Sequence, residues 1–183
     1  KEPNSVVVDV DPACLRRLVE HVRRQWTALG ASNPHWSVLT HDEYRAENLN
    51  EERLQRFYAS GEADANLIDV FERRAGRRVS RGRCFELGCG VGRVTKYLAQ
   101  KFESVVAADI SPGNLALCEK HMEEAGASNV KPVLLASPYD IDQLGDFDFF
   151  YSVISIQHNP PPVQKLLLDK ILPKIRVGGG CLF

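Results

Sequence analysis

The chain has 183 residues, of which 44% are hydrophobic and 26% charged, enough apolar material for one globular domain with a sizeable core. A formal net charge of -1 argues against nucleic acid or an anionic membrane as the main partner. No apolar run reaches the roughly 18 residues of a membrane span, and the first residues lack a signal-peptide layout, so we expect a soluble, cytoplasmic protein.

The cysteines point neither to a metal site nor to disulfide bonds. No two of the five form a C-x-x-C pair, and they lie far apart in the sequence. We therefore expect reduced thiols and no bound metal.

Residues 1–80 are predicted to form an N-terminal helical cap that contributes to substrate contacts. Apolar residues recur at helical spacing, and Asp11 followed by Pro12 is typical of a helix start. Gly61 separates the second and third helical patterns. The three helices are expected at about 11–29, 49–60 and 62–75.

From Arg83 onward, short β-rich runs alternate with helical ones. Such alternation is typical of right-handed βαβ crossovers, and it predicts an α/β fold with a mostly parallel, doubly wound, Rossmann-like sheet in residues 81–183. Strands are expected at 84–87, 104–108, 133–135 and 147–156, and helices at about 91–101, 112–124 and 161–172.

A glycine loop follows the first expected strand and opens a helix. Gly88, Gly90 and Gly92 allow the backbone to approach a ligand closely, because residues without a Cβ tolerate positive φ. The dinucleotide fingerprint G-x-G-x-x-G would need glycine at the position of Arg93. The spacing therefore argues against a nicotinamide cofactor.

Asp109 ends the second expected strand. It lies close to the roughly 20-residue offset at which a carboxylate meets a ribose diol in βαβ units. The alternative is a strand-end aspartate that only precedes a turn.

Residues 86–93, Glu-Leu-Gly-Cys-Gly-Val-Gly-Arg, and residues 108–111, Ala-Asp-Ile-Ser, resemble the first two motifs of class I S-adenosylmethionine-dependent methyltransferases of the small-molecule type. The resemblance extends from about Cys84 to the end of the chain. It implies that the segment Gly88, Cys89 and Gly90 passes under the methionine part of S-adenosylmethionine. It also implies that Glu86 orients the loop and a water, Asp109 holds the ribose and Ile110 packs on adenine.

The remaining cofactor contacts rest on the same resemblance. Ser137 occupies the place where the family often has an acidic residue for adenine, and it would serve through its hydroxyl or carbonyl. Pro138 or Tyr139 would then lie against the ring, or Asp140 would reach in instead. Tyr58, from the cap, is a candidate contact to the methionine end, although aromatic residues at helical spacing more often belong to a core.

The fourth expected strand, 147–156, reads as buried on both faces, which a central parallel strand requires. Ligands bind at the carboxyl ends of such strands, so Ser155 and His158 are predicted to border the transferred methyl group. Methyl transfer to a hydroxyl needs a proton acceptor, and His158 is the best base at that position. The alternative is a structural or substrate-positioning role, which many histidines at strand ends have.

The tract Asn159-Pro160-Pro161-Pro162 resembles only superficially the N-P-P-aromatic motif of enzymes that methylate nucleobases. Pro162 replaces the aromatic residue that would stack on a base, and the chain lacks basic charge. We interpret the tract as a turn that ends the strand and starts a helix, and we expect no nucleic-acid substrate.

The last residues, 178–183, are three glycines followed by Cys-Leu-Phe, where a fifth strand should begin. The resemblance implies two further strands, so we expect a core truncated at the fifth strand and a sequence cut at both ends. An apolar edge strand favours pairing with another chain, as a homodimer or through further attached domains.

The leading hypothesis is an enzyme that methylates an oxygen or nitrogen of a small molecule with S-adenosylmethionine. The second is a non-catalytic S-adenosylmethionine-binding module that regulates or scaffolds a larger protein. A nicotinamide oxidoreductase is third, because Arg93 disfavours it.

Overall fold

The computed structural model describes residues 6–183, and residues 1–5 of the expected cap lie outside the described residues. Five parallel strands form one sheet in the order β3-β2-β1-β4-β5. This arrangement confirms the predicted Rossmann-like α/β class. The strands are β1 Arg83–Leu87, β2 Ser104–Asp109, β3 Val130–Leu134, β4 Phe147–Tyr151 and β5 Ile175–Leu182.

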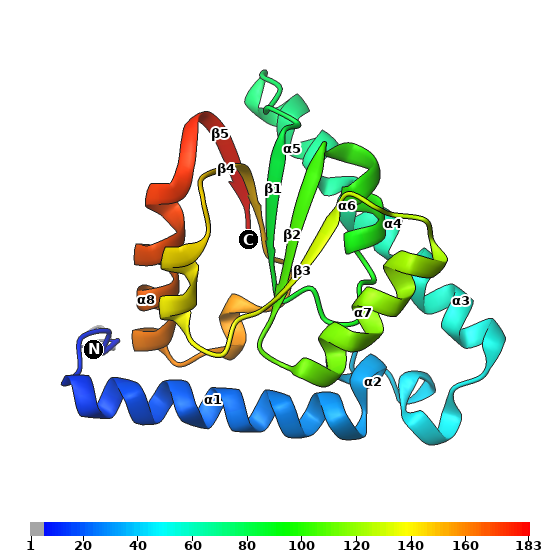
Figure 1. Cartoon of the computed structure of the whole chain (residues 1–183), viewed down its shortest axis with the longest axis horizontal. Helices are drawn as coiled ribbons and strands as arrows, with labels where there is room; N and C mark the ends of the chain where they lie inside the picture. The colour runs from blue at the N-terminus through cyan, green and yellow to red at the C-terminus, as the bar shows by residue number, and fades with distance from the viewer. Residues whose placement is uncertain (1–5) are drawn as a thin grey trace, which may run out of the picture.

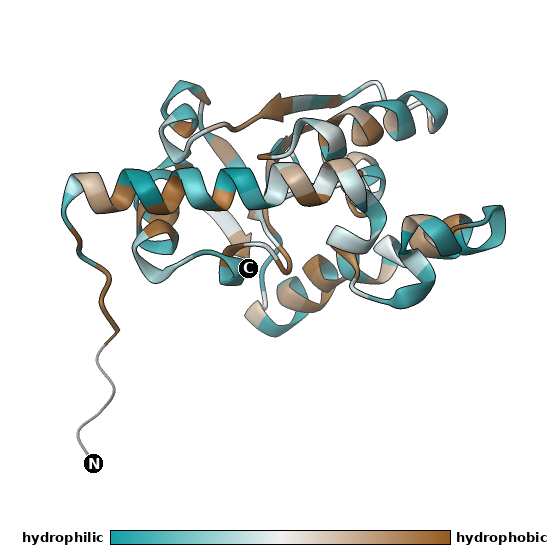
Figure 2. Cartoon of the chain, turned by 90° about the horizontal axis from the view of Figure 1, so that it is seen from below, coloured by the Kyte–Doolittle hydropathy of each residue, from teal (hydrophilic) through white to brown (hydrophobic). Residues whose placement is uncertain are grey.

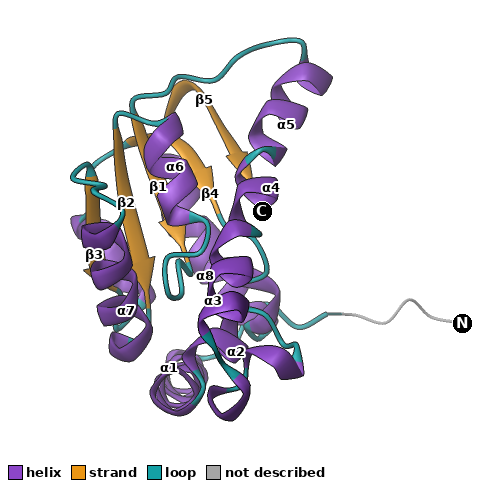
Figure 3. Ribbon diagram, turned by 90° about the vertical axis from the view of Figure 1, so that its right-hand side faces the viewer, coloured by secondary structure: helices purple, strands orange, loops and turns teal. Residues whose placement is uncertain are grey.

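Helices cover both faces of the sheet (Figure 3). Before the first strand come α1 Pro12–Ser32, α2 Pro34–Val38, α3 Glu51–Ala59, α4 Gly61–Ala65 and α5 Leu67–Ala75. The crossover helices are α6 Thr95–Lys101, α7 Pro112–Glu124 and α8 Pro161–Ile171. Among the described residues, none of these helices is both long and apolar enough to cross a membrane.

The side chains of successive strand residues pack alternately into two hydrophobic cores, one on each face of the sheet. Cys84, Val105 and Phe149 pack with residues of α4 to α7. Their immediate neighbours Phe85 and Phe150 point the other way and pack, with the rest of that core, against α8 and α1. The period-2 alternation of a strand thus explains why consecutive residues such as Cys84 and Phe85 are both fully buried.

Helix α1 lies across the carboxyl ends of the strands (Figure 1). Asp11 caps it by accepting hydrogen bonds from the backbone N–H groups of Ala13 and Cys14, both at 2.9 Å. Seen from below, the helix runs across the molecule with hydrophobic and hydrophilic residues interleaved (Figure 2). Its Gly30 packs so closely on the start of α7 that a Cβ there would lie 2.1 Å from the Ser111 hydroxyl oxygen.

Several expected boundaries differ from the structure. The fifth strand, expected to begin within residues 178–183, already begins at Ile175. The helix expected from 91 begins only at Thr95, because residues 90–94 form a turn in which Gly92 has a φ of +85°. The helix expected at 62–75 is divided into α4 and α5 at Asn66. The third strand begins at Val130 and includes Pro132, which an edge strand tolerates because one side of its ladder is unpaired.

The fourth expected strand is the largest correction, since β4 ends at Tyr151 and not at residue 156. The last ladder contact is the hydrogen bond from the Ser152 N–H to the Leu182 carbonyl, at 2.9 Å. Ile154 then adopts a φ of 55°, which is incompatible with an extended strand. The residues that follow form a 3-10 turn, Ile156–His158.

Candidate functional site

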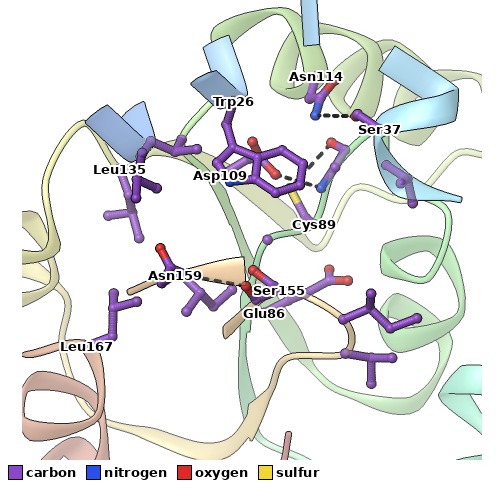
Figure 4. A pocket seen from close by; sticks show the side chains of 18 of the residues that line it. Trp26, Ser37, Glu86, Cys89, Asp109, Asn114, Leu135, Ser155, Asn159 and Leu167 are labelled. Atoms are coloured by element: carbon purple, nitrogen blue, oxygen red, sulfur yellow. Dashed lines mark hydrogen bonds between the residues drawn. The ribbon is translucent and has the colours of Figure 1, made fainter. Parts of the chain in front are cut away.

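A cavity opens at the carboxyl ends of β1, β2 and β4, beneath α1 (Figure 4). The space between its lining atoms, including a part that is open to solvent, is about 1150 Å³. Except for Tyr58, the predicted cofactor contacts line it. They come from β1 and the glycine loop, from the end of β2 and from the segments that follow the second, third and fourth strands. They are Glu86, Gly88, Cys89, Gly90, Asp109, Ile110, Ser137, Pro138 and Ser155.

The glycine loop is held in a conformation that side chains disfavour. Gly88 and Gly90 have φ values of +76° and +56°. The N–H groups of Gly88 and Cys89 both donate to the Ala108 carbonyl, at 2.8 and 3.0 Å. A Cβ on Gly90 would lie 2.5 Å from a methyl carbon of Val38 in α2. The backbone of Gly88 and Gly90, without side chains to cover it, therefore forms the floor of the cavity.

Asp109 joins the second strand to this loop. One carboxylate oxygen accepts a hydrogen bond from the Gly90 N–H and the other from the Ser111 N–H, each at 2.8 Å. Burial raises the pKa of the Asp109 carboxyl, while these backbone N–H groups oppose the rise. Each oxygen keeps a second lone pair, so the carboxylate can also accept hydrogen bonds from hydroxyl groups of a ligand in the cavity.

Glu86 is a buried carboxyl group on β1 that also lines the cavity. It accepts a hydrogen bond from the Thr95 hydroxyl at 2.7 Å. Burial raises the pKa of Glu86 to about 7, although the Thr95 hydroxyl and the nearby Arg93 charge act in the opposite direction. Tyr151 lies opposite Glu86 in the register of β1 and β4, and its buried hydroxyl has no hydrogen-bond partner among the described residues.

Arg93 connects the glycine loop to the N-terminal helices. Its guanidinium group forms an ion pair with Asp64 of α4 and donates a hydrogen bond to the Ser60 hydroxyl at 3.1 Å. The backbones also meet here, because a Cβ on Gly61 would lie 2.0 Å from the Arg93 carbonyl oxygen. Arg93 thus fills a structural position where a dinucleotide-binding loop would have glycine.

The segment after β3 turns at the rim of the cavity. The Ser137 N–H donates to the Asp140 carboxylate at 2.8 Å, and the Ser137 hydroxyl accepts from the Tyr139 N–H at 3.3 Å. Asp140 is thus engaged in capping the turn Pro138–Gln143, and neither it nor Tyr139 is among the residues that line the cavity. Leu135, Ser137 and Pro138 are the residues of this segment that line the cavity.

Two predicted site residues lie apart from the cavity lining. The Tyr58 ring stacks on His121 of α7 with centroids 3.7 Å apart, and its hydroxyl lies 3.4 Å from Nε2 of His35. His158 is exposed, and its ring packs edge-on against Trp26, with centroids 5.5 Å apart. His158 borders a shallow groove beside α1, and Trp26 borders both that groove and the cavity.

Sequence reasoning missed several residues that the cavity exposes. Val19, Val22 and Trp26 of α1 form part of its wall, together with Asn114 of α7 and Tyr151 of β4. The helical spacing of the α1 residues marked a buried face, but only the position of α1 in the fold reveals that this face covers a cavity. Among the described residues, no cluster of histidine, cysteine and acidic side chains is arranged to hold a metal ion.

Comparison with known proteins gives a consistent family assignment. Residues 85–179, more than half of the chain, match the sequence profile of a family described as methyltransferase domain. A ubiquinone biosynthesis O-methyltransferase from Psychrobacter cryohalolentis is 24% identical over 182 residues, which cover 96% of this chain and 63% of that protein. An uncharacterised protein from Synechococcus sp. is 34% identical over 101 residues, covering 52% of this chain and 24% of that protein.

Among solved structures, magnesium protoporphyrin IX methyltransferase from Synechocystis PCC 6803, with bound SAH, superposes with a TM-score of 0.58. The two sequences are 18% identical, and the match covers 85% of this chain and 67% of that one. This likeness shows a shared fold. The chain spans between 24% and 63% of the length of the curated relatives that it matches.

Proposed function

Because the chain belongs to the methyltransferase domain family, of the class I Rossmann-like type, we propose that it methylates an oxygen or nitrogen of a small molecule. The cofactor of this family is S-adenosylmethionine. The names of two relatives, both ubiquinone biosynthesis O-methyltransferases, favour oxygen as the acceptor atom.

The main support for the proposal is the hydrogen bond between Asp109 and the glycine loop. The hydrogen bond from the Gly90 N–H to Asp109 fixes a bare backbone floor beside a buried carboxylate. A ribose diol fits the carboxylate, which keeps free lone pairs, and an adenine ring fits the apolar side chains of Ile110, Leu135 and Pro138. The residues present therefore suit S-adenosylmethionine.

The chemistry requires alignment more than covalent participation of the protein. S-adenosylmethionine supplies an electrophilic methyl carbon bonded to a sulfonium sulfur. The glycine loop and Asp109 would orient the cofactor, and the α1 side chains above would exclude water and align the acceptor atom with the methyl carbon. The cap, residues 1–80, would thus supply substrate contacts to the binding core, residues 81–183.

We retain His158 as the candidate base for a hydroxyl acceptor. Its ring packs against Trp26 outside the cavity lining, so proton transfer to His158 requires a shift of Trp26 or a connecting water molecule. Replacing His158 with alanine should lower kcat without changing cofactor affinity. An unchanged kcat would leave His158 as a surface residue that packs on Trp26.

Calorimetry with S-adenosylmethionine, S-adenosylhomocysteine and NAD tests the cofactor assignment. We expect both adenosyl ligands to bind and NAD not to bind. Asp109→Ala should weaken binding by about tenfold or more, since it removes a buried acceptor. Gly90→Val should abolish binding, because its side chain would collide with Val38 and fill the floor.

The outcomes separate the competing functions. A folded protein that binds neither adenosyl ligand would refute the proposal. Binding without turnover on a panel of hydroxyl and amine acceptors would favour a non-catalytic regulatory or scaffold module. Binding of NAD alone would favour an oxidoreductase.

A further inference from the structure

Ile154 is the only non-glycine residue with positive φ in the described part of the chain, residues 6–183. Its φ of 55° is unfavourable for any side chain and especially for a β-branched one, whose two Cβ substituents crowd the backbone. Such strained residues are found mainly at functional sites. The sequence gives no local reason for the strain, because no glycine or asparagine stands at this position.

The structure on both sides of Ile154 holds the strained conformation in place. Before it, the Ser152 N–H donates to the Leu182 carbonyl at 2.9 Å, and the Ser152 hydroxyl donates to the Leu87 carbonyl at 3.1 Å. After it, the Ser155 carbonyl accepts from the Asn159 amide at 3.1 Å and from the His158 N–H at 3.2 Å. Hydrogen bonds thus hold the chain on both sides of Ile154, which restricts how far its backbone can relax.

The strain places an apolar side chain at the mouth of the cavity. Ile154 lines the cavity, yet its relative exposure is 51%. A large apolar residue that borders a ligand cavity and still meets solvent loses exposed surface when a ligand covers it. Its stability cost and its exposure are both explained if this side chain contacts a bound molecule.

The surroundings of Ile154 indicate the chemistry of that molecule. The acidic and basic residues of the cavity lining, Glu86, Arg93 and Asp109, are buried. Arg93 forms an ion pair with Asp64. Asp109 accepts a hydrogen bond from the glycine loop, and Glu86 accepts one from the Thr95 hydroxyl. Against these buried groups, α1 contributes only the apolar or aromatic side chains of Val19, Val22 and Trp26.

From this geometry we propose that Ile154 contacts the methyl acceptor and determines its class, a neutral ring compound with an apolar substituent. The ring would lie between Ile154 and Trp26, both of which border the cavity. This inference rests on the proposed function, because the acceptor is defined by the methyl transfer. Ile154 would then be a specificity residue, and its strained backbone would serve to place the side chain against the acceptor.

Two substitutions separate the side chain from the backbone strain. Asparagine tolerates the left-handed region and is similar in size to isoleucine, so Ile154→Asn removes only the apolar character and the strain. Ile154→Gly removes the whole side chain and fits the same φ. Leu172→Asn is a matched control, because Leu172 is an exposed apolar residue, 42% accessible, that does not line the cavity.

Binding can be measured without knowing the natural acceptor. The chain has two tryptophans, and in a Trp36→Phe background the fluorescence of Trp26 reports on the cavity. The neutral probe is para-butylphenol and the charged comparison is para-hydroxybenzoate. Each is titrated with and without S-adenosylhomocysteine, and calorimetry provides a second readout.

We expect para-butylphenol to bind more tightly than para-hydroxybenzoate. Both Ile154 variants should weaken para-butylphenol binding by about tenfold or more, and Leu172→Asn should leave it unchanged. The affinity for S-adenosylhomocysteine and the melting temperature should not fall in either Ile154 variant.

Four results would overturn the proposal. The first is no binding of para-butylphenol, and the second is an affinity for para-butylphenol that is the same in the Ile154 variants as in the unsubstituted chain. The third is equal or tighter binding of para-hydroxybenzoate. The fourth is a marked fall in the melting temperature of both variants, which would give Ile154 a structural role. The proposed function fails separately, if S-adenosylhomocysteine does not bind. Ile154-dependent binding of the phenol in that case would retain a ring-binding site without the methyltransferase assignment.

Discussion

Replacing Glu86 with glutamine should change how the stability of the fold depends on pH. Burial raises the pKa of this carboxyl from 4.5 to about 7. Between these two values the unfolded chain releases a proton that the folded chain keeps, so the free energy of unfolding decreases as pH rises. The stabilising contribution of the protonated Glu86 is complete below pH 4.5 and is lost as pH rises through about 7.

The magnitude follows from the difference between the two pKa values. One pKa unit corresponds to about 1.4 kcal/mol, so full ionisation of Glu86 costs about 3 kcal/mol of folding free energy. Glutamine has nearly the same shape and can still accept the hydrogen bond from Thr95, but it does not titrate. The stability advantage of Glu86→Gln over the natural chain should therefore grow by about 3 kcal/mol between pH 4.5 and pH 8.

Urea denaturation of both proteins across this pH range measures the effect. Other titrating groups, including Asp109, are common to both proteins, so the difference between the two curves isolates Glu86. Parallel curves would refute the reasoning, because they would mean that Glu86 has the same pKa in the folded and unfolded chain.

Two further substitutions test contacts between the N-terminal helices and the core. Gly30→Ala should destabilise the fold by about 2 kcal/mol in urea denaturation, although alanine favours a helix, because the new Cβ would lie 2.1 Å from the Ser111 hydroxyl oxygen. A stabilised variant would show that α1 does not pack there. Arg93→Met should cost about 1–2 kcal/mol, because it removes the partner of Asp64, whose side chain is partly exposed. Adding Asp64→Leu should recover part of the loss, and strictly additive effects would contradict the pairing.

Local chemistry in the sequence was sufficient to predict several elements. Helix α7 begins at Pro112 and ends at Glu124 as expected, because the Ser111 hydroxyl caps it by accepting from the Asn114 N–H. The prediction that the fourth strand is buried on both faces is confirmed for each residue of β4. The glycine loop and Asp109 were predicted to contact the same cofactor, and a hydrogen bond between Gly90 and Asp109 places them side by side.

The features that escaped prediction depend on tertiary contacts. β4 ends at Tyr151, and Ile154 then has a positive φ, although an isoleucine in an apolar run ordinarily favours a continuing strand. Trp26 borders the cavity only because α1 crosses the ends of strands that come much later in the chain. The roles proposed for Tyr58 and His158 remain predictions, and both side chains lie outside the cavity lining.

The position of α1 also bears on when the site forms during folding. The cavity wall combines Val19 and Trp26 of α1 with Val163 and Leu167 of α8, which are separated by most of the chain. Contacts of such long sequence separation require closure of a large loop, so they are slow to form. We expect a ribosome-bound nascent chain that still lacks α8 to have an incomplete cavity. A ligand that then binds between α1 and α8 would hold the early and late segments together and stabilise the completed fold by mass action.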